Sequence, residues 1–430
     1  MQISSSLRHF ATVAAVLATS PLPATAEPYG NSTRYSTWMA SSLISRRDGI
    51  MTGKGGSSEP LQAGFTQKAF KALLAQYPHN DIHAQNYLQA SVDSVVPYLS
   101  NATEDALSYP LDRLSNGNAM ISSLTGAQRS PRNETASYEL AVDALRQSID
   151  LNRRTDEGGL WYYTYPNWSY LDGMYSLAPF YTLYTVSHSG SNGTLINQTA
   201  LDDMALQVDL LWQHCLNASS GLLSHGYDAS LTAVWADPIT GASPHVWGRS
   251  LGWYVMALVD TLEILPRLTS TSETIEAFIK KFRTLASAVI QAVDPVTGGW
   301  WQVMDMPGRE GNYIESSGSA MFTYALFKGH RLGYLNDNVT ATAPVVARRA
   351  YEYLTDAFIV RNTNGTLGYN GTVSVCSLNS NASYKYYVGQ PIKYNSVLGS
   401  AAYILASLEF ERLESKHTGL KSRTRGYLSG

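Results

Sequence analysis

The chain has 430 residues, of which 44% are hydrophobic and only 15% are charged, and its formal net charge is −3. This length suffices for one large domain or for two or three ordinary ones. The near-neutral charge and the lack of any run of Lys or Arg exclude a nucleic-acid-binding surface. Aromatic residues make up 11% of the chain, which is common among sugar-binding proteins and among secreted proteins in general.

Residues 1–26 have the pattern of a secretory signal peptide. A basic Arg-His pair precedes the apolar residues 10–18, and Ala24-Thr25-Ala26 offers a small-x-small cleavage site. The apolar run is too short to span a bilayer, and no later stretch is long and apolar enough to do so. We therefore expect a secreted, extracellular protein with no membrane contact.

Asn-x-Ser/Thr sequons are frequent and indicate a eukaryotic secretory route with N-linked glycans. The only cysteines, Cys215 and Cys376, could form one disulfide in an oxidising compartment, but they are too few to build a disulfide scaffold. No Cys/His cluster has zinc-like spacing, so we expect no metal. The sequons begin at Asn31, Asn101, Asn133, Asn167, Asn192, Asn197, Asn217, Asn338, Asn364, Asn370 and Asn381.

Helical periodicity dominates the rest of the chain, and convincing alternating strands are scarce. Glycine followed by apolar or aromatic residues recurs between the helix pairs, at intervals of roughly 60–80 residues, which is about one helical hairpin with its loops. Each glycine can turn the chain and bring the following residues to one rim. These glycines are Gly158, Gly221, Gly298 and Gly365. The predicted helices cover residues 65–77, 85–99, 113–124, 137–153, 174–188, 199–214, 248–265, 273–292, 316–332, 341–357 and 395–413.

Helical hairpins repeated over this length form either an open solenoid or a closed ring. The high content of Ala, Leu, Tyr and Gly favours an all-α toroid, in which the inner helices are buried on all sides. No Pro/Ser linker follows residue 30, so we predict one catalytic domain. Residues 27–84 would form an N-terminal segment with the first helices of the barrel, residues 85–413 the catalytic barrel, and residues 414–430 a polar tail that frays.

Residues 243–254, Ser-Pro-His-Val-Trp-Gly-Arg-Ser-Leu-Gly-Trp-Tyr, form the most informative segment. Trp247, Arg249 and Trp253 lie where an amphipathic helix begins. Two indole rings beside a guanidinium suit a sugar that carries a carboxylate, because the rings stack on C–H faces and Arg binds the acid through a planar fork. The alternative is a pair of core tryptophans with a capping arginine.

Three further side chains are candidates for chemistry. Asp172 lies among aromatic residues near a predicted helix start. Exclusion of water favours a neutral carboxyl and a helix N-terminus favours a carboxylate, so this setting suits a general acid/base. Asp112 has a similar setting and could share a proton with Asp172; either aspartate could instead be a helix cap. His225, in a glycine-flanked loop, can face a ligand or solvent, while Glu315 is expected to have a structural role.

Four motifs, in order, resemble glycoside hydrolase family 105, the unsaturated rhamnogalacturonyl hydrolases, which are relatives of the family 88 unsaturated glucuronyl hydrolases. The resemblance covers roughly residues 85–412. The motifs are Leu-Asp-Gly-Met-Tyr-Ser-Leu-Ala-Pro-Phe at 171–180, Trp-Ala-Asp-Pro at 235–238, Trp-Gly-Arg-Ser-Leu-Gly-Trp-Tyr at 247–254 and Arg-Glu-Gly-Asn-Tyr-Ile-Glu-Ser-Ser at 309–317. No dinucleotide fingerprint, Walker loop or Gly-x-Ser-x-Gly elbow competes with them.

The resemblance implies an (α/α)6 barrel with no cofactor and no metal. It places the family's catalytic aspartate on Asp172, its second pocket carboxylate on Asp112 and its pocket histidine on His225. The substrate-binding residues would further include Trp161, Tyr162, Trp247, Arg249 and Trp253. Bacterial members often carry His after Leu-Trp, where this chain has Tyr162.

The implied reaction removes a Δ4,5-unsaturated galacturonic or glucuronic acid from the non-reducing end of pectin oligosaccharides left by a lyase. Asp172 would protonate C4 of the alkene and then help water to add at C5. The partner is therefore an unsaturated uronyl oligosaccharide, and we expect a monomer. Two alternatives are a secreted glycosidase that acts on saturated chains and a sugar-binding protein without turnover.

Overall fold

The computed structural model describes residues 34–125, 132–189 and 196–426, and the predicted signal peptide lies outside them. The described chain is mainly helical. Its helices are α1 Tyr35–Arg46, α2 Glu59–Gln76, α3 Ala84–Val95, α4 Gly117–Thr125, α5 Arg132–Asp150, α6 Asp172–Ser187, α7 Gln198–Cys215, α8 Gly248–Ile264, α9 Ser272–Gln291, α10 Ser316–Arg331, α11 Asp337–Phe358, α12 Tyr384–Val388 and α13 Val397–Gly426. Short 3-10 turns cover 96–98, 106–108, 111–116 and 269–271.

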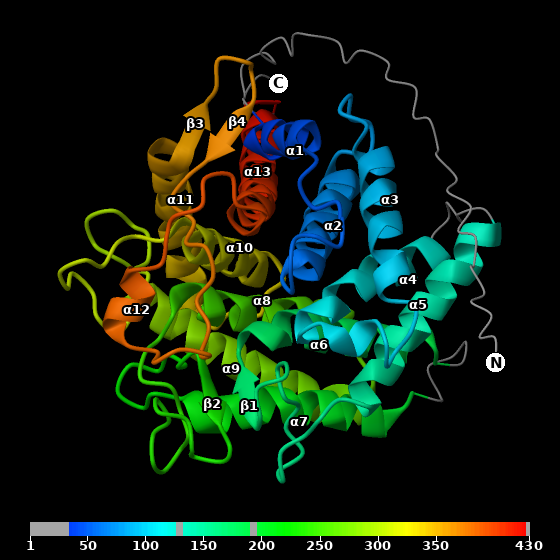
Figure 1. Ribbon diagram of the computed structural model, residues 1–430. Coiled ribbons are helices and arrows are strands. Elements are labelled where there is room, and N and C mark those ends of the chain that lie inside the picture. The colour runs from blue at the N-terminus through cyan, green and yellow to red at the C-terminus, as the bar shows by residue number, and fades with distance from the viewer. Residues whose placement is uncertain (1–33, 126–131, 190–195, 427–430) are drawn as a thin grey trace, which may run out of the picture. The chain divides into compact units, whose positions relative to one another are not determined.

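Six helices form a closed inner ring. In order they are α2, α4, α6, α8, α10 and α13; each packs against the next, and α13 packs against α2. The outer helices α3, α5, α7, α9 and α11 pack against α2, α4, α6, α8 and α10, and α1 packs against α13 (Figure 1). This arrangement is the predicted (α/α)6 barrel.

The burial pattern of the helices explains which of them form the inner ring and which form the outer ring. Every residue of α8 from Gly248 to Leu262 is buried, as is every residue of α10 from Ser316 to Gly329. An outer helix such as α9 buries only one stripe, which includes Ile275, Phe278 and Phe282. Helices that are apolar all round belong inside, and amphipathic helices cover them.

The long connections lie at one end of the ring, where the inner helices begin. All four glycines that recur between the predicted helix pairs, at 158, 221, 298 and 365, lie in these connections and have positive φ. Two short antiparallel sheets occur there as well: β1 Trp168–Tyr170 pairs with β2 Gly226–Asp228 from the next connection, and β3 Ile359–Arg361 pairs with β4 Leu367–Tyr369 as a hairpin. The predicted turning role of the glycines is thus confirmed, and the residues that follow them gather on one rim.

Each range predicted to be helical overlaps a helix of the structure. The sequence did not reveal α1, whose several serines are weak helix formers and whose Met39 and Leu43 are buried by packing. The helix α13 continues to Gly426 and so includes most of the predicted polar tail. None of the described helices combines the length and hydropathy needed to cross a membrane.

The opposite end of the ring holds a cavity of about 310 Å³ with a charged network. Asp260 accepts hydrogen bonds there from Lys68 (2.5 Å), Lys328 (2.7 Å) and Tyr324 (2.7 Å). Burial disfavours its charged form, but the two ammonium groups outweigh this effect and lower the pKa of Asp260 to about 2. The network therefore joins α2, α8 and α10 through one buried carboxylate.

We predict that Asp260→Asn lowers the free energy of unfolding by about 3–5 kcal/mol, because it removes the buried carboxylate that Lys68 and Lys328 share and leaves Lys328 with only the partly exposed Glu263 as counter-charge. Urea denaturation measures this loss. The control is Asp209→Asn, whose carboxylate pairs with Lys281 near the surface and should contribute less than about 1 kcal/mol. Equal losses in the two variants would contradict the prediction.

Candidate active site

The two-stranded sheet of β1 and β2 joins two distant loops of the rim. Asp172 comes two residues after β1, and His225 comes directly before β2. The Leu171 N–H donates to the His225 carbonyl at 3.0 Å, which extends this sheet by one more hydrogen bond. The side chains of Asp172 and His225 are therefore set next to each other by backbone pairing.

Gly226 makes this pairing possible. A Cβ at this position would lie 2.4 Å from the Ser169 carbonyl oxygen, a separation that no real side chain tolerates. The glycine beside His225 thus serves the close approach of two strands, and His225 itself is fully buried rather than facing solvent.

Asp172 begins α6 and retains 9% exposure. Its Oδ2 accepts a hydrogen bond from the Ser250 hydroxyl at 2.5 Å, and the His225 Nε2 lies 3.3 Å from the same oxygen. That nitrogen has no aligned hydrogen-bond partner among the described residues. A carboxyl and an unsatisfied imidazole nitrogen thus face the same small space.

Asp112 lies on the 3-10 turn that leads into α4 and is 2% exposed. Its Oδ2 accepts a hydrogen bond from the Tyr162 hydroxyl at 2.7 Å, whereas its Oδ1 has no partner among the described residues. Burial, aided by the negative charge of Asp172, raises the pKa of Asp112 to about 7, although Tyr162 and Arg113 oppose the shift. Asp112 is thus the carboxyl that the structure keeps protonated in weakly acidic solution.

Aromatic rings form one wall of the site. Tyr162 stacks on Tyr170 at a centroid distance of 4.4 Å, and Tyr170 meets the His225 ring edge-on at 5.2 Å. Trp161 is half-buried, and the Arg153 guanidinium lies 5.4 Å from its ring centroid. The predicted residues Trp161 and Tyr162 thus lie on the same rim as the two aspartates.

Arg249 and Trp247 lie beside the site, but the guanidinium and the indole ring are already in contact with other protein groups. Arg249 is 1% exposed, and its guanidinium donates to the backbone carbonyls of Val373 (2.6 Å) and Ser374. It also lies 4.7 Å from the ring centroid of Trp247, which is 2% exposed and packs beside His225. The predicted grip of Arg249 on a substrate carboxylate is corrected, because backbone oxygens already occupy the fork.

Trp253 does not join the site. Its ring packs against Phe65 and Tyr175 at centroid distances of 4.7 and 4.5 Å, inside the core of the inner ring, and it is 1% exposed. The prediction of a sugar-stacking platform at this position is wrong, since neither face of the indole is open.

Three residues of the site were missed in the sequence. Ser250 stands inside the Trp-Gly-Arg-Ser motif, so its position on the first helical turn was a usable signal. Tyr387 donates or accepts a hydrogen bond at the His225 Nδ1, 2.8 Å away, although the two residues are 162 positions apart. Gln302 accepts a hydrogen bond from the Trp247 indole at 3.0 Å. The last two contacts depend on the tertiary fold and have no local signal.

Cys215 and Cys376 are both buried and free, so the disulfide considered from the sequence is not formed. Burial raises the pKa of the Cys376 thiol to about 12, which keeps it neutral. Within the described part of the chain, no group of three His, Cys, Asp or Glu side chains could hold a metal ion.

Glu315 has the structural role predicted for it. It caps α10, because its carboxylate accepts a hydrogen bond from the Gly318 N–H at 2.7 Å.

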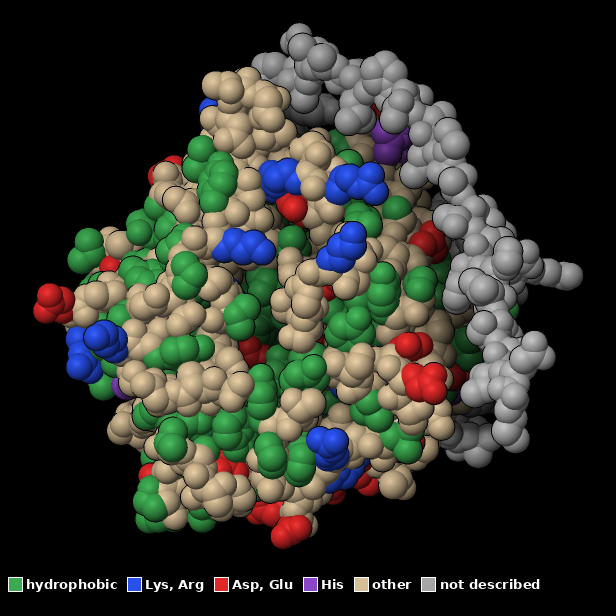
Figure 2. Space-filling model, viewed as in Figure 1, with side chains coloured by type: hydrophobic (Ala, Val, Ile, Leu, Met, Phe, Trp, Pro, Cys, Tyr) green, Lys and Arg blue, Asp and Glu red, His purple; other side chains and the backbone are tan. Residues whose placement is uncertain are grey.

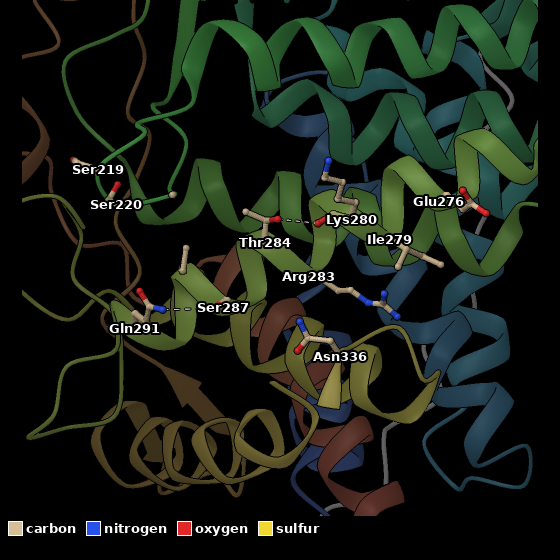
Figure 3. Close-up of a pocket in the computed structure, with 12 residues that line it drawn as sticks. Ser219, Ser220, Glu276, Ile279, Lys280, Arg283, Thr284, Ser287, Gln291 and Asn336 are labelled. Atoms are coloured by element: carbon tan, nitrogen blue, oxygen red, sulfur yellow. Dashed lines mark hydrogen bonds between the residues drawn. The ribbon is translucent and has the colours of Figure 1, made fainter. Parts of the chain in front are cut away.

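The surface offers one larger hollow away from this site. A groove of about 770 Å³ runs between residues 219–221 and the outer side of α9, with Glu276, Lys280 and Arg283 on its wall (Figure 3). Among the described residues that line it, Glu276 is the one that carries a carboxyl group. On the face shown in Figure 2, charged side chains of both signs are scattered around a central hollow that hydrophobic side chains border.

A helical toroid that gathers two carboxyls, an imidazole and aromatic rings at one rim has the architecture of an (α/α)6 glycoside hydrolase. The family model described as Glycosyl Hydrolase Family 88 matches residues 62–414. A solved Family 105 glycoside hydrolase from C. acetobutylicum ATCC 824 is 31% identical, with a TM-score of 0.75 over 88% of this chain and 99% of that one. The chain belongs to glycoside hydrolase family 105, within the wider family 88 group.

Two further proteins are similar to this chain. The 24.9 kDa protein in picA locus of Rhizobium radiobacter is 36% identical over 197 residues, which are 44% of this chain and 82% of that protein. The unsaturated glucuronyl hydrolase from Bacillus sp. GL1 shares 14% identity, with a TM-score of 0.62 over 88% of this chain and 95% of that one. At this low identity, the second likeness concerns the fold alone.

We predict that Asp112→Asn raises the melting temperature at pH 8 and has a smaller effect at pH 5. Because the pKa of Asp112 is raised from 3.8 to about 7 on folding, its contribution to stability falls as the pH rises through that range and is lost above it. Asparagine never ionises and so avoids this loss. Scanning fluorimetry at both pH values measures the shift.

Asp203→Asn is the control with the same change of charge. Asp203 pairs with Arg154 at 2.7 Å, and although burial opposes the shift, this pairing lowers its pKa, so its removal should decrease the melting temperature at pH 8. If Asp112→Asn lowers the melting temperature at pH 8, or changes it equally at both pH values, the assigned protonation of Asp112 is contradicted.

Proposed function

We propose that this protein removes a Δ4,5-unsaturated galacturonic or glucuronic acid from the non-reducing end of lyase-generated pectin oligosaccharides, with rhamnogalacturonan fragments as the main substrates. Membership of family 105 supports this class of substrate. The observation that carries the proposal is the convergence of Asp172, Asp112 and His225 on one rim. Among the described residues, neither the Asp112 Oδ1 nor the His225 Nε2 has an aligned hydrogen-bond partner.

In the proposed reaction, the Asp172 carboxyl gives its proton to C4 of the alkene, and positive charge develops at C5 and the ring oxygen. The Asp172 carboxylate then takes a proton from the water that adds at C5. The resulting hemiketal opens and the next sugar leaves with its oxygen. This route is hydration of an alkene, and it differs from ordinary two-carboxylate glycoside hydrolysis.

The surrounding groups position the substrate. Protonated Asp112, held by Tyr162, can donate a hydrogen bond to a substrate oxygen, and the His225 Nε2 is available to another. Ser250 fixes the orientation of the Asp172 carboxyl. The aromatic wall of Tyr162 and Tyr170 lowers the access of water, which strengthens each of these polar contacts.

Loss of the ultraviolet absorbance of the conjugated alkene tests the proposal. The purified protein should bleach unsaturated galacturonyl-rhamnose, and Asp172→Asn should slow this by about 10²–10⁴-fold, the usual contribution of one acid/base group. The control, Asp237→Asn, changes an exposed carboxylate that caps a turn of the same rim and should leave the rate unchanged.

The alternatives give different results with the same substrates when reducing ends and binding are measured beside the absorbance. Unchanged absorbance with both galacturonyl and glucuronyl substrates rejects the proposed reaction. New reducing ends without loss of the alkene indicate a glycosidase for saturated chains. Calorimetric binding without any product indicates a sugar-binding protein.

We further propose that the protein acts outside the cell. The signal-like residues 1–26 and the many sequons support this location, and the sequon asparagines Asn101, Asn217, Asn364 and Asn381 are exposed. Expression in a eukaryotic secretory host should therefore yield protein in the medium whose mass falls on treatment with an N-glycosidase. Retention of an unglycosylated chain inside the cell would contradict this location.

A further inference from the structure

A long segment between β4 and α13 lies across the candidate site. We call residues 371–396, which include α12, the strap. Its Val373 peptide is held on both sides by buried charged groups: the Glu315 carboxylate accepts from the Val373 N–H at 3.1 Å, and Arg249 donates to the Val373 carbonyl at 2.6 Å. Arg249 and Glu315 are each 1% exposed, so this attachment is shielded from water.

The strap has further attachments to the rim. The Gln302 amide donates to the Tyr387 carbonyl at 3.1 Å, and the Trp235 indole donates to the Leu378 carbonyl at 2.8 Å. Apolar side chains of the strap join Trp235 and Trp247 in a second hydrophobic cluster, separate from the core of the inner ring. The strap is therefore a fixed part of the rim rather than a loose surface loop.

The strap places the Tyr387 hydroxyl 2.8 Å from the His225 Nδ1. Tyr387 is fully buried, and burial raises its pKa well above 10, so the phenol keeps its proton. No other acceptor for this proton is recorded among the described residues, so the hydroxyl donates to Nδ1 and avoids a buried unsatisfied donor. The imidazole proton is then on Nε2, the nitrogen that lies 3.3 Å from Asp172.

We infer that Tyr387 is a positioning residue that sets the tautomer of His225, and that Arg249 serves the site by fastening the strap that carries Tyr387. This role rests on the proposed function. It differs from the sequence-based expectation in that the arginine binds the protein's own backbone instead of a uronate carboxylate.

Tyr387→Phe removes only the hydroxyl. We expect kcat on unsaturated galacturonyl-rhamnose to fall by about 10–100-fold, with KM changed less than about twofold, because the hydrogen bond that orients His225 is lost while the aromatic ring at this position is kept. Tyr386→Phe is the matched control: it removes the neighbouring phenol, which accepts from the Ser377 N–H at 2.8 Å, and should preserve kcat.

A spectroscopic measurement separates this inference from the proposed function. In protein labelled with ¹⁵N in the histidine rings, the signal assigned to His225 by its loss in His225→Gln should report the Nε2–H tautomer, and Tyr387→Phe should shift it while Tyr386→Phe does not. An unchanged signal, or an unchanged kcat, in Tyr387→Phe overturns the inference. If the wild-type protein has no activity on any unsaturated uronide, the proposed function is overturned. The catalytic role of Tyr387 is then overturned with it, even if the His225 signal shifts in Tyr387→Phe.

Limited proteolysis tests the role of Arg249. Trypsin can cut the strap at the exposed Lys385 and Lys393. Arg249→Gln should speed this cleavage several-fold without substrate, whereas Arg283→Gln, which removes another guanidinium that donates to a backbone carbonyl, should not. Equal protection of the strap in Arg249→Gln and wild type would show that Arg249 does not fasten it.

Discussion

The pairing of β1 with β2 is the constraint on which the site depends. Asp172 and His225 belong to different hairpins of the barrel, and the inner ring alone would leave their loops free to move apart. The backbone hydrogen bonds of this short sheet, with the contact from Leu171 to the His225 carbonyl, remove that freedom. Ser250, at the start of α8, ties its hydroxyl to the same carboxylate, so three elements meet at one oxygen.

The site contains buried polar atoms that lack an aligned hydrogen-bond partner among the described residues. A buried polar atom without a partner costs about 1–3 kcal/mol. Among the residues that the structure describes, neither the Asp112 Oδ1 nor the His225 Nε2 has an aligned partner. The closed double ring has enough buried apolar surface to offset that cost. A ligand that supplies the missing partners regains this free energy on binding, which is how a pre-organised site converts stability into affinity.

The sequence predicted what depends on local pattern. Helical periodicity located the eleven ranges that overlap helices, and the recurring glycines marked the turns of the rim. Asp172 at a helix start was also foreseen. Trp253 was misplaced because four residues after Arg249 is one helical turn, and on an inner helix one turn leads from the rim into the core. Tyr387 could not be found, since only the folded strap brings it to a histidine 162 residues away.

The closure of the ring has a consequence for biosynthesis. The first described helix, α1, packs on the last, α13, and the Ser36 hydroxyl donates to Glu411 at 2.7 Å across a separation of 375 residues. A nascent chain therefore exposes an unpaired flank of its inner helices until α13 has left the ribosome. Such late, non-local closure makes folding slow and leaves the growing polypeptide dependent on chaperones for longer than a chain of local hairpins would be.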